Sequence, residues 1–505
     1  MAGERADAAD PARLPSVLHE THTAWIALVG DVALKVKKPV RFPFLDFSTL
    51  AGREVACRRE VALNRRLAPD AYLGVWTVLD QDGAPCEYVV AMRRMPEDRS
   101  LAALVERRDP ACESTIDAIA AQLAAFHRHA ERGRHVDRWC GREAQRERWN
   151  ENFAEMRATG VFAAADLDRA EALAHRFLDG REVLFLERIR AECCCDGHGD
   201  LQASDIFCLD DGPRILDCIE FDDRYRYGDV AADVAFLAMD LERLGAPDLG
   251  QQLMGRYEEI SAAELPTPLM EHYIAYRAQV RAKVAALRTR SESDPPTREA
   301  DVALARRLLG LCLEHLERAD VRVAIVGGLP GSGKSTLAEQ LAKATGAAVL
   351  RSDVIRAALF DRSPGESPEV GYGTGRYDQR HDDATYDELL DRAHHELAHG
   401  RSVVLDASWS SATRRAQVRR LANDLHASPV ELMCVVDDTE AARRIAERAA
   451  AGSDASEATA EIRVRMADDF DGWPEAAVVD TAGPVGAALP GALDAWRRAA
   501  AAPLR

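Results

Sequence analysis

The chain has 505 residues, more than the roughly 250–300 at which one hydrophobic core stops growing, so two or three domains are expected. An apolar fraction of 47% and a charged fraction of 30% predict a soluble globular protein, and no apolar run approaches the ~20 residues of a membrane span. A formal net charge of −19 argues against general binding to nucleic acid or to anionic membranes.

The first residues, "MAGERADAADPARLP", are polar and acidic and lack the apolar segment of a secretory signal, so we expect a cytoplasmic protein. The eleven cysteines are mostly scattered, which is typical of free thiols in a reducing compartment. Cys193, Cys194 and Cys195 are adjacent, with His198 nearby, which raises the alternative of a zinc site. Because consecutive side chains of an extended segment point to opposite faces, we favour a thiol-rich loop.

The first hundred residues predict strands around one helix. Residues 23–30 and 32–38 are β-rich runs joined by Gly30-Asp31, which is a hairpin signal. Residues 53–68 contain no Gly or Pro and predict a helix, and residues 86–95 predict another strand.

Helices dominate from about residue 100. A helix is expected to begin after Ser114 as N-cap, with Ile116, Ile119 and Leu123 on one face. Strand signals return at residues 201–221. Further long helices are predicted in three segments: 229–245, 267–290 and 297–319.

The pattern changes at Val321. Residues 321–328 form a short, fully apolar strand, which is typical of a buried parallel sheet. Three more such runs follow, at 347–353, 401–408 and 430–436, with helical segments between them. Strands that alternate with helices predict a doubly wound α/β domain, and we place its boundary near residue 320.

"GGLPGSGKST" (327–336) contains a complete phosphate-binding loop between a strand and a helix. Its glycines let successive backbone N–H groups point at phosphate oxygens, and the helix N-terminus adds a favourable dipole. Lys334 is predicted to reach the β- and γ-phosphates of ATP, and Ser335 to hold Mg²⁺. The predicted nucleotide-binding residues of this loop are Gly328, Gly331, Ser332, Gly333, Lys334, Ser335 and Thr336.

Polar residues after the next two strands extend this site. Asp353 stands at the carboxyl edge of the sheet, where ligands bind in such folds, and Asp406 is placed to help hold Mg²⁺. Arg444 and Arg448 share one helix face before a segment that could close over the triphosphate.

This half resembles the P-loop small-molecule kinases of the gluconate kinase and zeta-toxin kind. The resemblance covers roughly residues 320–475. It implies that Asp353 is the acceptor-side base, that Arg356 contacts the substrate and that 449–465 form a lid.

"HGDLQASDI" (198–206) in the first half places Asp200 where a phosphoryl-transfer loop needs a proton acceptor. The motif resembles the catalytic loop of the aminoglycoside phosphotransferase family, whose fold is that of protein kinases. The resemblance spans about residues 20–318 and implies that Lys35 is the ATP lysine and Glu60 its helix partner. "VVAMRRMPED" would be the hinge that holds adenine.

The motif departs from the family pattern at two positions. Gln202 replaces a His that takes no part in the chemistry, and Asp205 replaces the metal-binding Asn. A carboxylate can ligate Mg²⁺ as an amide can, although it adds negative charge beside the phosphates. The family's second metal ligand falls nearest Glu220, with Asp217 and Asp222 as alternates.

We therefore predict an α/β protein: a bilobal protein-kinase-like α+β domain over residues 1–318, then a P-loop domain with a parallel sheet over 319–505. The expected function is transfer of phosphate from ATP, with Mg²⁺, to small-molecule hydroxyl acceptors, in both halves. One alternative is a first half that only senses nucleotide and regulates the second. A nucleic-acid repair kinase is a third possibility, which the charge weakens and a basic groove beside Asp353 would revive.

Overall fold

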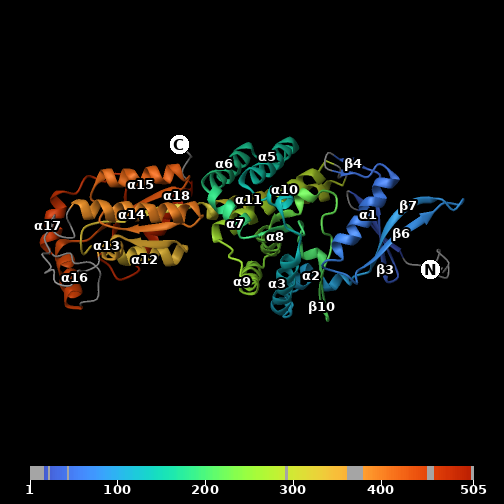
Figure 1. Ribbon diagram of the computed structural model, residues 1–505, viewed down its shortest axis with the longest axis horizontal. Helices are drawn as coiled ribbons and strands as arrows, with labels where there is room; N and C mark the ends of the chain where they lie inside the picture. Colours follow the sequence, from blue (N-terminus) through green and yellow to red (C-terminus); the bar gives the residue numbers. More distant parts are fainter. Residues whose placement is uncertain are drawn as a thin grey trace. The chain divides into compact units, whose positions relative to one another are not determined.

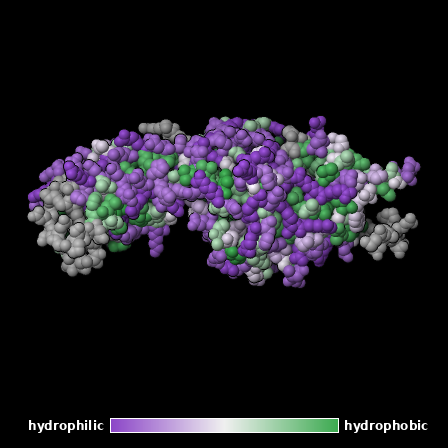
Figure 2. All heavy atoms as spheres, viewed as in Figure 1, coloured by the Kyte–Doolittle hydropathy of each residue, from purple (hydrophilic) through white to green (hydrophobic). Residues whose placement is uncertain are grey.

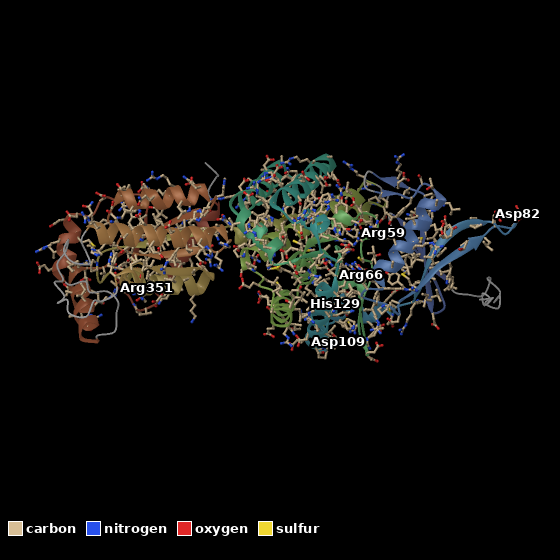
Figure 3. The ribbon with its side chains drawn as sticks, in the orientation of Figure 1. Arg59, Arg66, Asp82, Asp109, His129 and Arg351 are labelled. Atoms are coloured by element: carbon tan, nitrogen blue, oxygen red, sulfur yellow. The ribbon has the colours of Figure 1, made fainter. Side chains whose placement is uncertain are left out.

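The N-terminal sheet is antiparallel and follows the predicted hairpin. In the computed structural model, which describes residues 16–20, 23–42, 45–290, 294–360, 379–451 and 460–501, its strand order is β1-β2-β3-β7-β6. The bounds are β1 Ser16–Glu20, β2 Ala24–Val29, β3 Val32–Lys37, β6 Tyr72–Leu79 and β7 Pro85–Arg93. Val29 pairs with Val32 across the predicted turn, and Asp82 lies at the tip of the β6–β7 hairpin (Figure 3).

Helix α1 (Leu50–Asn64) packs on β6 and β7 and begins at Thr49, whose side chain accepts a hydrogen bond from the Gly52 N–H. Its buried face places Cys57 and Val61 against Val90 of the sheet. The helix thus holds Glu60 over β3, where it pairs with Lys35. Two short strands precede it, β4 Arg41–Phe42 and β5 Leu45–Asp46.

A helical region follows the sheet and carries the catalytic-loop motif between short strands. Its elements are α2 Leu101–Glu106, α3 Cys112–His129, α4 Arg134–Asp137, β8 Cys194–Asp196, β9 Ile206–Leu209, β10 Gly212–Ile215, β11 Tyr227–Asp229, α8 Val230–Arg243 and α9 Pro247–Ser261. The predicted N-cap of α3 is wrong, because the helix starts at Cys112 and the Ser114 hydroxyl instead donates to the Ala111 carbonyl in the first turn.

The second sheet is entirely parallel, with strand order β13-β14-β12-β15-β16 and helices on both faces (Figure 1). Its strands are β12 Arg322–Gly327, β13 Ala348–Arg351, β14 Val403–Asp406, β15 Ser428–Val435 and β16 Ala477–Asp480. Its helices are α12 Lys334–Thr345, α13 Ser352–Leu359, α14 Gln379–Ala398, α15 Ala412–Asp424, α16 Asp438–Ala451, α17 Ala460–Asp468 and α18 Leu489–Ala501. The predicted α/β fold class is confirmed, and β16 is a strand that the sequence did not reveal.

Packing divides the chain into two units that do not follow chain order. One unit comprises residues 1–144, 188–265 and 276–281, and the other comprises 145–187, 266–275 and 282–505. The second unit therefore contains the parallel sheet and most of α5 Arg142–Thr159, α6 Ala164–Gly180, α7 Glu182–Arg190, α10 Thr267–Arg288 and α11 Pro295–Ala319. The division into residues 1–318 and 319–505 stays a prediction, because these units follow packing and cut through single helices.

The turn between α6 and α7 packs tightly against the P-loop half within that second unit. A Cβ on Gly180 would lie 2.1 Å from the Leu425 carbonyl oxygen, so only glycine fits there. The buried Arg181 donates to the same carbonyl at 2.8 Å, and burial lowers its pKa to about 9. Residues 319–505 are therefore only part of this packed unit, and experiments on the sites need the full chain.

The three adjacent cysteines are buried around β8, and all are free thiols. Among the described residues, no group of three His, Cys, Asp or Glu side chains is placed to hold a metal ion, so the zinc alternative gains no support. No helix in the described part of the chain is long and apolar enough to cross a membrane. The visible face of each unit is mostly hydrophilic (Figure 2).

Candidate functional sites

The phosphate-binding loop runs from the end of β12 to the start of α12, and its glycines are sterically required. Gly328, Gly331 and Gly333 have φ values of +141°, +81° and +79°. A Cβ added to Gly328 would lie 2.5 Å from the Cys434 carbonyl oxygen. A Cβ added to Gly331 would lie 2.8 Å from the Ala441 carbonyl oxygen. These contacts explain why the loop can follow its tight path only with glycine at these positions.

Lys334 and Ser335 open α12 directly after the loop, and Thr336 follows on its exposed side. Asp406 ends the neighbouring strand β14, which pairs Val326 with Asp406. Burial raises the pKa of Asp406, against the opposing effects of Lys334 and of a hydrogen bond from Ser335. The structure thus brings together the lysine, the hydroxyl and the carboxylate that the sequence predicted as one site.

Two buried polar atoms at this site have no hydrogen-bond partner among the described residues. They are Ser332 Oγ, in a residue only 1% exposed, and Asp406 Oδ1, in a residue 4% exposed. Buried polar atoms without partners are costly, and functional ones are commonly satisfied by a ligand or an ion. The residues present therefore fit a nucleotide phosphate with Mg²⁺ beside Ser335 and Asp406.

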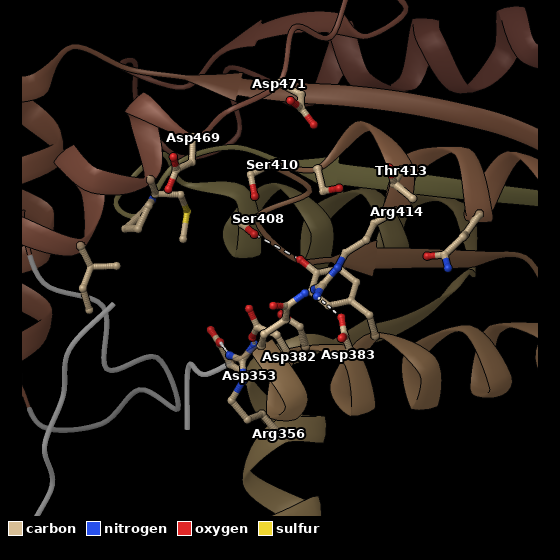
Figure 4. Close-up of a pocket in the computed structure, with 18 of the residues that line it drawn as sticks. Asp353, Arg356, Asp382, Asp383, Ser408, Ser410, Thr413, Arg414, Asp469 and Asp471 are labelled. Atoms are coloured by element: carbon tan, nitrogen blue, oxygen red, sulfur yellow. Dashed lines mark hydrogen bonds and ion pairs between the residues drawn. The ribbon is translucent and has the colours of Figure 1, made fainter. Parts of the chain in front are cut away.

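A pocket of about 680 Å³ opens beside Lys334 at the carboxyl edge of the sheet. Asp353 and Arg356 enter it from α13, and Asp382 enters from α14 (Figure 4). Arg356 lies between the two carboxylates, 3.3 Å from Asp353 and 2.7 Å from Asp382. Both predicted acceptor-side residues, Asp353 and Arg356, therefore line the same pocket as the phosphate-site lysine.

Arginines of α16 and α17 surround the loop from the other side. Arg444 donates to the Thr481 carbonyl at 2.8 Å, and its guanidinium lies 3.1 Å from where a Cβ of Gly333 would stand. Arg448 lies in α16, but its side chain falls outside the described residues, as does much of the predicted lid at 449–465. Sequence reasoning missed Arg463, which is buried and donates to the Pro330 carbonyl of the loop at 2.7 Å.

The kinase-like unit contains a second cluster of charges. Lys35 Nζ, on β3, lies 2.9 Å from Glu60 Oε1 and 2.6 Å from Asp217 Oδ1. Burial disfavours the charged lysine, but Asp217 and Glu60 outweigh this and the pKa of Lys35 is raised well above its ordinary value. The predicted lysine–glutamate pair is thus formed, with Asp217 as an additional partner.

Asp200 and Asp205 lie near each other and near Asp217. The pKa of Asp200 is raised to about 6, chiefly by burial; Arg281 and Arg277 oppose this effect, and Asp217 adds to it. Burial, with Asp217 and Asp200, holds the pKa of Asp205 well above its usual range. Burial acts together with nearby carboxylates, which disfavour each other's ionisation, so the pKa values of Asp200 and Asp205 are both raised.

The structure separates Glu220 and Asp222 from this carboxylate group. Glu220 forms an ion pair with Lys37, and Asp222 accepts a hydrogen bond from the Arg224 N–H and pairs with its side chain at 2.7 Å. Asp217, which the sequence left as an alternate, is the one that contacts Lys35. The roles of all three as metal ligands remain proposals, and the geometry favours Asp217.

Helix α8 fixes the catalytic loop. Asp233 accepts hydrogen bonds from the N–H groups of His198 and of Gly199, the latter at 2.9 Å. Burial opposes ionisation of Asp233, but hydrogen bonding to His127 and nearby cations hold its pKa below its ordinary value. The loop that carries Asp200 is therefore held in place by two hydrogen bonds to a buried carboxylate.

A protein-family model described as an AAA domain matches residues 323–472. The uncharacterized protein Rv2004c of Mycobacterium tuberculosis (strain H37Rv) is 43% identical over 484 residues, which are 95% of each chain. The chain belongs to the family of this mycobacterial protein. The alignment with this relative extends through both halves of the chain.

Solved structures resemble each half of this family separately. A gluconokinase from Sinorhizobium meliloti aligns with 36% of the chain and 94% of its own, at 19% identity and a TM-score of 0.27. A choline kinase from Cryptosporidium parvum aligns with 61% of the chain and 91% of its own, at 9% identity and a TM-score of 0.40. The AAA-domain match covers the P-loop and most of the parallel sheet.

Proposed function

We propose that the chain is an ATP-dependent phosphotransferase that transfers the γ-phosphoryl group to hydroxyl groups of small molecules, with one site in each half. The observation that carries the proposal is the P-loop beside the pocket that holds Asp353. A phosphate-binding loop with unsatisfied buried polar atoms adjoins a polar cavity of about 680 Å³ with a carboxylate in it. Nucleotide and acceptor can then bind side by side.

In the P-loop half, Lys334 and the loop N–H groups bind the phosphates of ATP. Mg²⁺ bound with ATP would neutralise charge on the phosphates, and Ser335 and Asp406 are the residues that we propose to hold it. Asp353 accepts the proton of the acceptor hydroxyl while the hydroxyl oxygen bonds to the γ-phosphorus. The bond between the γ-phosphorus and the bridging β-phosphate oxygen breaks, which releases ADP. Arg356, paired with Asp353 at 3.3 Å, orients that carboxylate.

The lining of this pocket favours a neutral or cationic hydroxyl compound as acceptor. Its charged residues are six aspartates, two arginines and one lysine among those described. Arg356 is held by Asp353 and Asp382, and Arg414 binds Asp383 at 2.9 Å (Figure 4). With both arginines paired and Lys334 assigned to ATP, no described cation is left over for an anionic acceptor. The same charge balance gives no basic groove beside Asp353, which disfavours a nucleic-acid substrate.

In the kinase-like half, Lys35 binds the ATP phosphates and Glu60 orients it. Asp200 acts as the base for a second acceptor, and Asp205 and Asp217 are the proposed metal ligands in place of Glu220 and Asp222. The alternative is a half that binds nucleotide without transferring it and regulates the P-loop site. The two readings differ in whether Asp200 is needed for turnover.

The test uses the full chain, with ATP binding measured by titration calorimetry and ADP release measured over time. We expect two ATP sites, of which Lys334→Ala weakens one by about 10- to 150-fold, since a charged hydrogen bond contributes ~1.5–3 kcal/mol. Lys343 is exposed at the other end of α12, so Lys343→Ala is the matched control and should change neither ATP affinity nor ADP release. ATP binding and turnover that are unchanged by Lys334→Ala would contradict the proposal for the P-loop half.

A further inference from the structure

Helix α10 places two arginines over the catalytic loop of the kinase-like unit. Arg277 Nη1 donates to the Gly199 carbonyl at 3.0 Å, and its Nε donates to the Ala232 carbonyl at 3.1 Å. Arg281 follows four residues later, and residues at i and i+4 lie on the same face of a helix. The face of α10 that fixes the loop backbone therefore also presents Arg281 to it, one turn further along.

Arg281 is partly buried, and among the described residues it forms no hydrogen bond and no ion pair. A guanidinium carries five N–H donors, and leaving a partly buried charge without partners is unfavourable. Its charge reaches Asp200, because after burial Arg281 is the strongest influence on the pKa of that carboxyl and lowers it. An unpartnered cation thus lies beside the proposed base.

The other cations around Asp200 and Lys35 already have partners. Lys35 and Lys37 share Glu60, and Arg277 is bound to two backbone carbonyls. The loop residue that contacts the base is neutral: the Gln202 side-chain amide donates to Asp200 Oδ2 at 2.9 Å. Arg281 is therefore the cation available to a ligand that is bound at Asp200.

We propose that Arg281 binds an anionic group, a carboxylate or a phosphate, on the hydroxyl compound that Asp200 activates. The inference rests on the proposed function of the kinase-like half and names its substrate class: a hydroxy acid or a phosphorylated alcohol. The guanidinium fork matches the paired oxygens of either group. Lys35 enters the site from β3 and pairs with Asp217, whereas Arg281 enters from α10, so Arg281 is assigned to the acceptor and not to the nucleotide.

The two halves would then accept different substrates. The P-loop pocket has an excess of carboxylates and no cation to spare, whereas the kinase-like site has an unpaired arginine beside its base. An anionic acceptor would be attracted to the second site and repelled from the first, so each half would discriminate against the other's substrate by charge.

The test uses the full chain with Lys334→Ala throughout, which weakens nucleotide binding at the P-loop site. Binding of a non-hydrolysable ATP analogue with Mg²⁺ is measured first, and inorganic phosphate is then titrated into the protein saturated with the analogue. We expect Arg281→Ala to raise the phosphate Kd at least 10-fold, and Arg281→Lys, which keeps the charge and loses the fork, to raise it less. Arg128→Ala, an exposed arginine of α3, is the matched control and should leave the Kd unchanged.

A second measurement uses pairs of compounds that differ by one anionic group: glycerol with glycerol 3-phosphate, and sorbitol with gluconate. The anionic member should stimulate ADP release more, or inhibit it competitively, and Arg281→Ala should remove the difference. A phosphate Kd equal in Arg281→Ala and its parent overturns the inference while leaving nucleotide binding intact. Failure of the analogue to bind overturns the proposed function of this half, and the inference with it. Thermal unfolding shows whether each variant is folded. If Arg281→Ala is not folded, the phosphate Kd of Arg281→Lys decides the test.

Discussion

Lys37 binds the second carboxylate oxygen of Glu60, with its Nζ 2.7 Å from Oε2, while Lys35 takes the first oxygen at 2.9 Å. Both lysines lie on one face of β3, because alternate residues of a strand share a face. Burial opposes ionisation of Glu60, but the two lysines lower its pKa to about 2. Glu60, the partner of the lysine that we propose to bind ATP, is therefore held by a second, buried lysine.

Replacing Lys37 by Met should destabilise the kinase-like unit by about 3–5 kcal/mol, because the buried Glu60 and the half-buried Glu220 would be left with one cation fewer. Urea unfolding of the full chain should show one transition moved to lower urea. Lys38→Met removes a lysine that pairs with the exposed Glu20, and it should cost no more than about 1 kcal/mol. Equal effects of the two substitutions would mean that the buried network contributes little.

Asp353→Asn should lower phosphate transfer by about 10²–10⁴-fold and leave ATP affinity nearly unchanged, because the base acts on the acceptor and not on the nucleotide. Transfer is measured as acceptor-stimulated ADP release, and affinity by titration calorimetry. Asp387→Asn, at another aspartate of the same pocket, is the control for the loss of one negative charge. A parallel loss of ATP affinity in Asp353→Asn would place this carboxylate on the phosphate side.

Gly331→Ala should abolish nucleotide binding at the P-loop, since the new Cβ would lie 2.8 Å from the Ala441 carbonyl oxygen at a φ of +81°. Gly346→Ala has nearly the same backbone conformation, a φ of +71°, with no atom within 4 Å of the new Cβ. That control bears only the conformational cost, about 1 kcal/mol, and should bind ATP normally. Normal ATP binding by Gly331→Ala would show that the loop can move away from α16.

Sequence patterns predicted the parts of the sites that lie within one short motif. The P-loop is recognisable because its glycines, lysine and serine are adjacent in the chain, and "HGDLQASDI" places Asp200 and Asp205 for the same reason. Lys37 was missed because a lysine near the end of a strand is usually solvated. The signal was available, since Lys35 and Lys37 are two residues apart on a strand and so face the same side.

Arg281 and Arg463 could not be assigned from local pattern. Each comes from a helix far along the chain, and only tertiary packing brings α10 to the catalytic loop or α17 to the Pro330 carbonyl. The choice between Glu220 and Asp217 had the same difficulty, because three acidic residues lie within a few positions and their side chains diverge. Strand β16 was missed because only one of its four residues is buried.

The pH dependence of the kinase-like site should follow Asp200. Its pKa is raised to about 6, so in the Lys334→Ala chain kcat/KM should rise about tenfold per pH unit up to about pH 6 and level off above it. The effect on stability has the opposite sign. Asp200 stabilises the fold at pH values below its ordinary pKa of 3.8, and this stabilisation is lost as the pH rises through about 6. Arg281→Ala should move the midpoint of the rate profile upward. A profile that is flat from pH 5 to pH 8 would exclude Asp200 as the base.

Asp205→Asn separates an active kinase-like half from one that only binds nucleotide. In an active half the asparagine keeps an oxygen ligand and removes one ionisable carboxyl beside Asp200, so turnover should persist with an altered Mg²⁺ dependence. Asp200→Asn should abolish that turnover, because it removes the proton acceptor. ADP release is measured with Mg²⁺ and Mn²⁺ titrated, in the full chain carrying Lys334→Ala, so that the contribution of the P-loop site is reduced. Turnover that survives Asp200→Asn would refute the catalytic role of Asp200. Nucleotide binding without any turnover, with either the neutral or the anionic test compounds, would favour the regulatory alternative.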